Sequence, residues 1–349
     1  MSKPLLLITL FITTLLTTCY SEAEVNGMFV FGSSIMDSGN NNYLPDSTAR
    51  ADYLPYGLDF PLGPTGRFSN ARNIIDVLGS LLGLPSLIPV FNDPQTRGDK
   101  VIHGVNYASG GSGILDSTGS VSGRVITLTQ QINNFEGVTL PELRARSVDL
   151  RKYLFVVGTG GNDYLLNYFL IPVAQRPSLI SFTMTLISTL SKRLQTLYSL
   201  GARKFVLLNI NPNGCAPVVT ARMSGFCNEP INAAILYYNA HLRLLVYHLR
   251  LSLPGSKLVY INAYKIIRDI INDPRHQGFS EVKQPCCKVS SNGLLCERGG
   301  SVCQSRNSYL YFDGLHVTDA VNALIARKAY DTNNIFEAYP TNVKNLARL

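Results

Sequence analysis

The chain lacks the patterns that would indicate a bound metal or a nucleic-acid partner. No Cys-x-x-Cys pair occurs among its 349 residues and its 5 histidines are dispersed, so we expect no metal site. The net charge is +8, yet the lysines and arginines are scattered and form no dense basic stripe. We therefore expect a solvated surface with weak affinity for acidic polymers, and no nucleic-acid partner.

Long apolar runs are also scarce. The run at 5–16 is broken only by threonines and is shorter than the roughly 20 residues that a membrane span needs. Lys3 precedes this run and Ser21-x-Ala23 follows it, which is typical of a secretory signal peptide over 1–23. An N-terminal anchor helix is the alternative. We expect a secreted, extracellular protein without a transmembrane segment, able to reach acidic polymers of a cell wall.

Two further absences narrow the chemistry. No Asn-x-Ser/Thr acceptor occurs, so N-glycosylation is not expected. No Gly-x-Ser-x-Gly occurs either, so the sharp nucleophile elbow of another hydrolase class is excluded. The segment Gly110-Gly111-Ser112-Gly113 comes close to this pattern but lacks its final glycine. It is also too short and misplaced to be a phosphate-binding loop. We expect no cofactor.

Residues 24–349 contain no Pro/Ser-rich linker, repeat or low-complexity run, so we expect a single domain. Strand-like and helix-like patterns alternate along it, which predicts a three-layer α/β/α fold with a mostly parallel central sheet. The expected strands are 28–31, 153–157, 204–210 and 258–261, and the expected helices are 71–82, 178–200, 231–251, 263–271 and 318–330. Asn70 is the expected cap of the first helix and Gly83 its stop.

The cysteines predict disulfide bonds, as is usual in an exported chain. Cys19 would leave with the signal peptide, and the cysteines that remain are Cys215, Cys227, Cys286, Cys287, Cys296 and Cys303. About 15 connectivities are formally open for such a set. A bridge between the adjacent Cys286 and Cys287 would be strained. A local Cys215–Cys227 bridge then leaves Cys296 and Cys303 as their partners, in an order that the sequence leaves open.

Residues suited to nucleophilic catalysis lie toward the two ends of the chain. Ser34 follows an apolar strand, whereas Asp313 and His316 precede the last expected helix. A serine hydroxyl is a poor nucleophile until an imidazole takes its proton, and a carboxylate must orient that imidazole. An Asp and a His three residues apart can share one turn-like loop. Each residue alone could be only a cap or turn residue, but together they predict a catalytic triad.

Two glycine-rich segments could supply the groups that stabilise an oxyanion. Gly110 lies in Asn106-Tyr107-Ala108-Ser109-Gly110-Gly111, and Asn162 lies in Gly160-Gly161-Asn162-Asp163-Tyr164. A backbone N–H and a side-chain amide are suitable donors. Either residue could instead serve only a turn. We expect an oxyanion hole built from Ser34, Gly110 and Asn162, on loops beyond the carboxyl ends of parallel strands.

These segments, together with 64–70 (Pro-Thr-Gly-Arg-Phe-Ser-Asn) and the paired Cys286 and Cys287, resemble the GDSL (SGNH) esterase/lipase family, in particular its plant secreted branch. The resemblance covers nearly all of 24–349 and implies an SGNH-hydrolase-like fold. It also implies the same triad and the same oxyanion donors. One departure stands beside the nucleophile, because the family's Gly-Asp-Ser-Leu reads Gly32-Ser33-Ser34-Ile35 here. Lesser departures are Phe312, where Trp is usual, and Val317, where Pro is usual.

The resemblance implies a secreted serine esterase or lipase that hydrolyses lipid, acyl or acetyl esters through an acyl-enzyme on Ser34. Two alternatives stay open. Ser33 would also suit a weakened or inactive relative that binds lipid or wall glycan, and an acyltransferase would use the same triad. The apolar stretch 164–171 could line an acyl pocket or belong to the core. We expect Ser33→Asp, which restores the family residue, to raise turnover or thermal stability.

Overall fold

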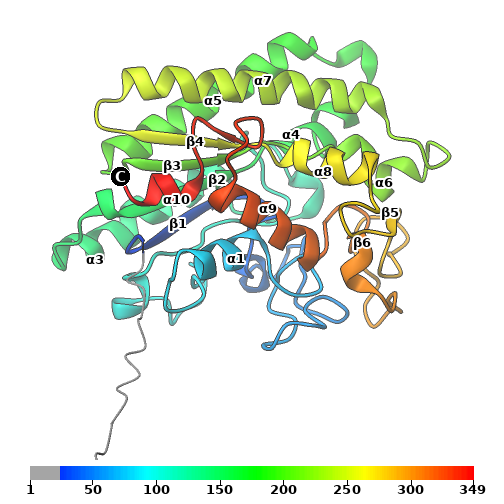
Figure 1. The fold of residues 1–349 in the computed structure, drawn as a ribbon, viewed down its shortest axis with the longest axis horizontal. Helices are drawn as coiled ribbons and strands as arrows, with labels where there is room; N and C mark the ends of the chain where they lie inside the picture. The colour runs from blue at the N-terminus through cyan, green and yellow to red at the C-terminus, as the bar shows by residue number, and fades with distance from the viewer. Residues whose placement is uncertain (1–23) are drawn as a thin grey trace, which may run out of the picture.

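The computed structural model describes residues 24–349, so the expected signal peptide lies outside the described residues. A five-stranded sheet of order β1-β2-β3-β4-β7 forms the centre of the molecule (Figure 1). Its strands are β1 (Gly27–Gly32), β2 (Tyr153–Gly158), β3 (Lys204–Leu208), β4 (Lys257–Ile261) and β7 (Ala338–Tyr339). β1 to β4 pair in parallel, and only β7 is antiparallel to its neighbour.

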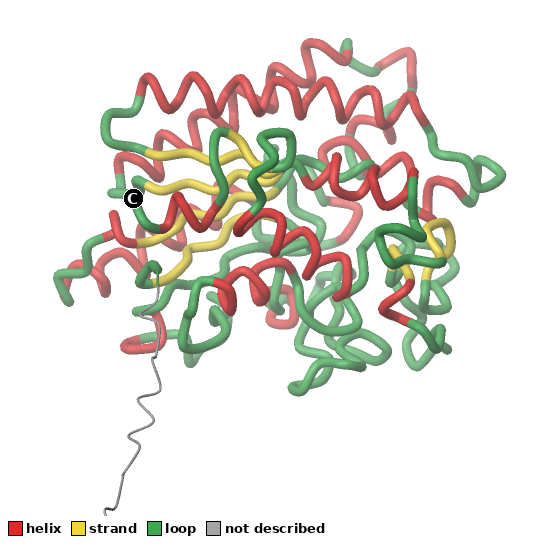
Figure 2. The backbone as a smooth tube through the Cα atoms, viewed as in Figure 1, coloured by secondary structure: helices red, strands yellow, loops and turns green. Residues whose placement is uncertain are grey.

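Helices cover both faces of this sheet, which makes the predicted three layers (Figures 1 and 2). In β1, Phe29 and Phe31 face one apolar core while Met28 and Val30 face the other. The first core also receives α5 (Leu179–Ser199) and α7 (Glu229–Ser252). The second core receives α1 (Ile74–Leu81), α8 (Ala263–Asn272), α9 (Asp319–Asp331) and α10 (Val343–Ala347). Strands buried on both faces account for the continuous apolar runs in the sequence.

The predicted elements recur with shifts of up to three residues at their starts, the largest of them in α1. α1 begins at Ile74 rather than at 71, and its cap is Asn73, whose side chain accepts the N–H groups of Ile75 and Asp76. Asp76 in turn accepts the N–H of Asn73, which completes a capping box. The prediction of Asn70 as the cap was therefore wrong. β3 also ends at Leu208, before the predicted 210.

Several short elements were not predicted. They are α2 (Leu128–Asn134), a π-helical turn (Phe135–Thr139), α3 (Leu140–Ala145), α4 (Gly161–Leu165), α6 (Pro217–Thr220), and a small parallel pair of β5 (Glu281–Pro285) with β6 (Tyr309–Tyr311). Single 3-10 turns lie at Asn40–Tyr43, Gly98–Val101, Ser120–Ser122, Leu150–Lys152, Tyr168–Leu170, Val173–Gln175, Asn213–Cys215 and Arg306–Ser308. Elements this short carry too little periodicity to be recognised in a sequence.

Disulfide bonds join Cys215 to Cys227, Cys286 to Cys303 and Cys287 to Cys296. The structure thereby decides the order that the sequence left open. Glu229 lies near Cys215 and Cys227, but both sulfur atoms are used in their disulfide and cannot act as thiolate ligands. Across residues 24–349, no helix combines the length and apolarity that crossing a membrane requires.

Candidate active site

The structure brings Ser34, His316 and Asp313 together in a hydrogen-bonded relay. Ser34 lies just beyond the carboxyl end of β1. Its Oγ is 2.8 Å from His316 Nε2, and His316 Nδ1 is 2.8 Å from Asp313 Oδ2. All three side chains are buried, and Asp313 has no exposed surface. This arrangement can pass a proton from the serine hydroxyl to an imidazole whose second nitrogen is held by a carboxylate.

The Asp313 carboxylate is held by groups besides the histidine. Its Oδ1 accepts the N–H groups of Leu315 (2.8 Å) and His316 (2.6 Å), which folds the segment into a tight turn. Its Oδ2 accepts the hydroxyl of Tyr56 at 2.6 Å. Burial, together with the charge of Asp313, holds the pKa of Tyr56 well above its usual range, so that this hydroxyl stays a donor. Sequence reasoning missed Tyr56, because nothing local connects it with Asp313.

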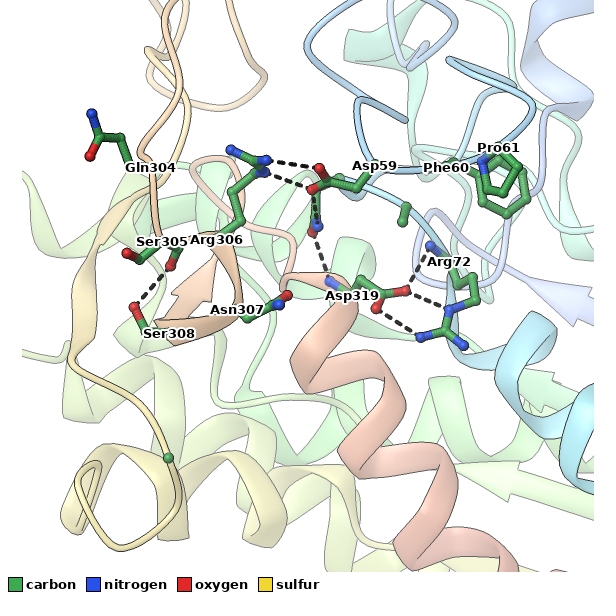
Figure 3. A pocket seen from close by; sticks show the side chains of 13 residues that line it. Asp59, Phe60, Pro61, Arg72, Gln304, Ser305, Arg306, Asn307, Ser308 and Asp319 are labelled. Carbon is green, nitrogen blue, oxygen red and sulfur yellow. Dashed lines mark hydrogen bonds and ion pairs between the residues drawn. The ribbon is translucent and has the colours of Figure 1, made fainter.

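Two ion pairs, drawn in Figure 3, involve Arg306 and Asp319, which precede and follow Asp313 and His316 in the chain. Arg306 binds Asp59 through two hydrogen bonds of 2.6 and 2.8 Å, and Arg72 binds Asp319 at 2.9 and 3.0 Å. Asn70 joins the two pairs, since its amide donates to Asp59 and its carbonyl accepts the N–H of Asp319. These pairs border a polar cavity of about 860 Å³ that none of the relay residues lines. The two pairs therefore border a pocket separate from the relay.

The expected oxyanion donors differ in how free their N–H groups are. The N–H of Ser34 has no partner among the described residues. Asn162 donates one amide hydrogen to the Ser112 carbonyl at 2.9 Å, which leaves its second hydrogen available. Gly110 donates its N–H to Asp37 Oδ2 at 2.9 Å. The neighbouring Gly111 lines the same cavity as Ser34 and Asn162, and its N–H has no partner within residues 24–349.

Asp37 is a site residue that the sequence analysis did not single out. It is fully buried, and besides Gly110 it accepts the N–H groups of Gly39 and Asn40, both at 2.8 Å. It therefore connects the loop after Ser34 to the Gly110 loop. Asn41 strengthens the same connection by donating to the Gly110 carbonyl at 2.9 Å. One signal in the sequence could have indicated this role of Asp37. In Ser34-x-x-Asp37-x-Gly39-Asn40, the aspartate stands two and three residues before backbone N–H groups that its carboxylate can accept.

Asp163 supports the other side of the site in the same way. It accepts the N–H groups of Ile114 and Leu115 and the hydroxyl of Thr118, at 2.8 to 3.0 Å. Burial raises the pKa of both Asp37 and Asp163 to about 6, against the hydrogen bonds that favour the charged form. Both loops that present candidate oxyanion donors are thus fastened by a buried carboxylate.

These pKa values predict how stability depends on pH. In the folded chain both lie above the ordinary value of 3.8, so the folded state binds the two protons more tightly than the unfolded chain. The two groups should therefore stabilise the fold increasingly as the pH falls from about 6 toward 3.8, and lose that contribution as the pH rises through about 6. Urea titrations should show a higher free energy of unfolding near pH 5 than near pH 7, with a weaker rise in Asp163→Asn. A flat or falling stability over this interval would contradict the assignment.

Two cavities of different character meet at the relay. The larger has a volume of about 650 Å³ and is lined mainly by apolar side chains, among them Phe68, Val121, Leu165, Leu166, Phe169, Leu170, Val218, Val219, Met223, Ile231, Leu294 and Leu295. The smaller has a volume of about 40 Å³, and most of the residues that line it are polar. Ser34, Asn162, Leu315 and His316 line both. The stretch 164–171 contributes Leu165, Leu166, Phe169 and Leu170 to the larger cavity, whereas Tyr164 and Tyr168 are buried in the core.

Comparisons with known proteins identify a family. The family described as GDSL-like Lipase/Acylhydrolase matches residues 28–329. "GDSL esterase/lipase At1g29670" of Arabidopsis thaliana is 39% identical over 94% of this chain and 93% of its own length. "GDSL esterase/lipase 7" of the same plant is 39% identical over 92% of both chains. The chain belongs to the GDSL lipase/acylhydrolase family, which confirms the resemblance seen in its motifs.

A solved structure, that of LAE5, an alpha/beta hydrolase enzyme from the metagenome of Lake Arreo in Spain, is 11% identical to this chain. It covers 89% of this chain and 96% of its own with a TM-score of 0.39. A likeness that distant carries no argument about the site.

Proposed function

We propose that residues 24–349 form a single domain that hydrolyses carboxylic esters outside the cell through an acyl-enzyme on Ser34. The observation that carries this proposal is the unbroken relay from Ser34 Oγ through His316 to Asp313, at the end of a largely apolar cavity of about 650 Å³. The relatives' names, esterase/lipase, support the same reaction. Export is supported by the pattern at 1–23 and by the disulfides, which persist in oxidising compartments.

In the proposed reaction, His316 Nε2 takes the proton of Ser34 as Oγ attacks the ester carbonyl carbon. Asp313 holds the imidazole in the tautomer that leaves Nε2 free to accept, and stabilises the imidazolium that forms. His316 then gives its proton to the departing alcohol, which leaves the acyl group on Ser34. Water repeats these steps and releases the carboxylic acid.

The oxyanion of each tetrahedral intermediate needs donors that are free to turn to it. We assign this role to the N–H of Ser34, the second amide hydrogen of Asn162 and the N–H of Gly111. Gly110, the donor that the motif implied, already gives its N–H to Asp37 and would support the loop instead. Losing one such donor typically lowers turnover about 10²–10³-fold.

We propose an ester with an apolar acyl group as the substrate, because the larger cavity is lined mainly by Leu, Val and Phe side chains. A binder without activity would not need the relay, and nothing in the contacts of Ser33 breaks it. Ser33 keeps its backbone in place by donating its N–H to Gly158 and accepting from Met36 and Asp37. The relay therefore favours the enzyme over the inactive lipid or glycan binder.

A serine-directed fluorophosphonate probe tests the proposal. We expect the purified chain to be labelled at Ser34, because only a hydroxyl relayed to an imidazole attacks phosphorus rapidly. Ser34→Ala should lose both the label and the hydrolysis of p-nitrophenyl esters. Ser33→Ala, one residue away, is the matched control and should keep the label. A well-folded wild-type protein that takes no label, or takes it elsewhere, would refute the proposal.

A further inference from the structure

The small cavity beside Ser34 is built from the carboxyl ends of three adjacent strands. Ser33 follows β1, Thr159 follows β2 and Asn211 lies just beyond β3. Since these strands are neighbours in the parallel sheet, the three side chains gather at one point of its edge. Asn213 completes the polar lining.

Two polar atoms of this lining have no hydrogen-bond partner within residues 24–349. They are the hydroxyl of Thr159 and the side-chain amide oxygen of Asn211. The Thr159 side chain is only 6% exposed, so bulk solvent does not reach its hydroxyl. Buried polar groups are almost always paired, because an unpaired one loses its hydration without compensation. Both atoms therefore need a hydrogen-bond partner, which a small polar molecule bound in the cavity would supply.

The volume of the cavity and the chemistry of these two atoms indicate which molecule binds there. The cavity, with a volume of about 40 Å³, exceeds the roughly 10–15 Å³ that one water molecule needs. The side-chain amide oxygen of Asn211 can only accept a hydrogen bond, whereas the Thr159 hydroxyl can also donate one. Water satisfies both needs, while a carboxylate could donate nothing to Asn211.

The residue at position 33 keeps this cavity open. The family's usual aspartate, in Gly-Asp-Ser-Leu, would place a longer, charged side chain among these polar groups. Ser33 carries only a short hydroxyl at this point of the lining. The cavity is thus linked to the one departure that stands directly beside the nucleophile.

We propose that this cavity binds the water that resolves the acyl-enzyme. The inference rests on the proposed function, and its physical basis is that Ser34 and His316 line both cavities. When the acyl chain on Ser34 occupies the large apolar cavity, its carbonyl carbon would face the small polar cavity. His316 Nε2 takes a proton from this water while its oxygen bonds to the acyl carbon. The bond from that carbon to Ser34 Oγ then breaks, and Oγ takes the proton back from His316.

A bound water in this cavity would also affect whether water or an alcohol resolves the acyl-enzyme. A water held in this cavity beside His316 would reach the acyl carbon before an alcohol from solution, which favours hydrolysis. Thr159, Ser33 and Asn211 would position the water and would not themselves react with the substrate.

The test measures how the acyl-enzyme divides between water and an added alcohol. A p-nitrophenyl ester is turned over in methanol–water mixtures, and the burst of p-nitrophenol, the steady-state rate and the ratio of acid to methyl ester are recorded. Thr159→Val removes the hydroxyl without changing the side-chain shape. We expect an unchanged burst rate, a slower steady state, and a shift of about 3–10-fold toward the methyl ester, the size of effect expected for losing one hydrogen bond.

Thr129→Val is the matched control, because Thr129 also has a buried hydroxyl without a partner among the described residues but does not line this cavity. It should leave the ratio unchanged. Ser33→Asp gives a second variant in case Thr159→Val fails to fold. It should fill the cavity and shift the ratio in the same direction, with a raised melting temperature.

An acid-to-methyl-ester ratio that neither Thr159→Val nor Ser33→Asp alters would overturn the water site, even if both variants remain active. A general loss of stability alone could not change this ratio, because it acts equally on both products. The absence of any burst or acylation of Ser34 in the wild-type protein would instead refute the proposed function. The two failures are thereby distinguishable.

Discussion

Asp313→Asn is expected to lower kcat about 10⁴-fold, the size of effect typical when the carboxylate of such a triad becomes an amide. The carboxylate accepts from His316 Nδ1, from Tyr56 and from two backbone N–H groups. An amide cannot accept at both of its ends, so either the imidazole takes the wrong tautomer or Tyr56 loses its acceptor. Steady-state hydrolysis of a short p-nitrophenyl ester measures the loss.

Asp319→Asn is the control for this variant. Asp319 lies in the same part of the chain and pairs with the half-exposed Arg72, but it makes no contact with His316. Partly exposed ion pairs contribute at most about 1 kcal/mol, so this variant should keep kcat within a few-fold of the wild type. Equal losses in the two variants, with melting temperatures unchanged, would argue against a role of Asp313 in the relay.

Asp37→Asn is expected to be the most damaging change outside the triad. Asp37 accepts the N–H groups of Gly39 and Asn40 at one oxygen and that of Gly110 at the other. The amide oxygen of asparagine can keep the first two, but its nitrogen cannot accept the N–H of Gly110. Each buried N–H left without an acceptor costs roughly 1–3 kcal/mol. Because Gly110 would also be released, the neighbouring Gly111 should move, and we expect kcat to fall about 10²–10³-fold, as for a lost oxyanion donor.

Two measurements separate these effects of Asp37→Asn. Urea titration gives the loss of stability, and kcat measured well below the melting temperature gives the loss of function in the folded protein. Asp116→Asn, at an exposed position beyond the Gly110 loop, should change neither. A variant that is destabilised but retains full kcat would show that Asp37 supports the fold without positioning the site.

Much of the candidate site could be predicted because its residues lie in short sequence motifs. Ser34 directly after an apolar strand, and Asp313 three residues before His316, need no knowledge of the fold to be recognised. The parallel sheet was predictable for a similar reason, since strands buried on both faces are continuously apolar and alternate with amphipathic helices. Helix starts were less certain, because Asn70 and Asn73 are both good caps and only the Asp76 carboxylate at the third helical position favours Asn73.

The sequence by itself determined which residues could form a triad, because side-chain type and spacing limit which proton transfers are available. It left hydrolysis, acyl transfer and an inactive binder open. The tertiary structure alone decided which neighbours those residues have. Among residues 24–349, it gives the Gly110 N–H to Asp37 and leaves that of Gly111 without a partner. It also places the Tyr56 hydroxyl on Asp313 and gathers Ser33, Thr159 and Asn211 around one cavity. Each of these contacts joins residues far apart in the chain, and the direction of a hydrogen bond across such a distance depends on how strands and loops pack, which no local pattern records.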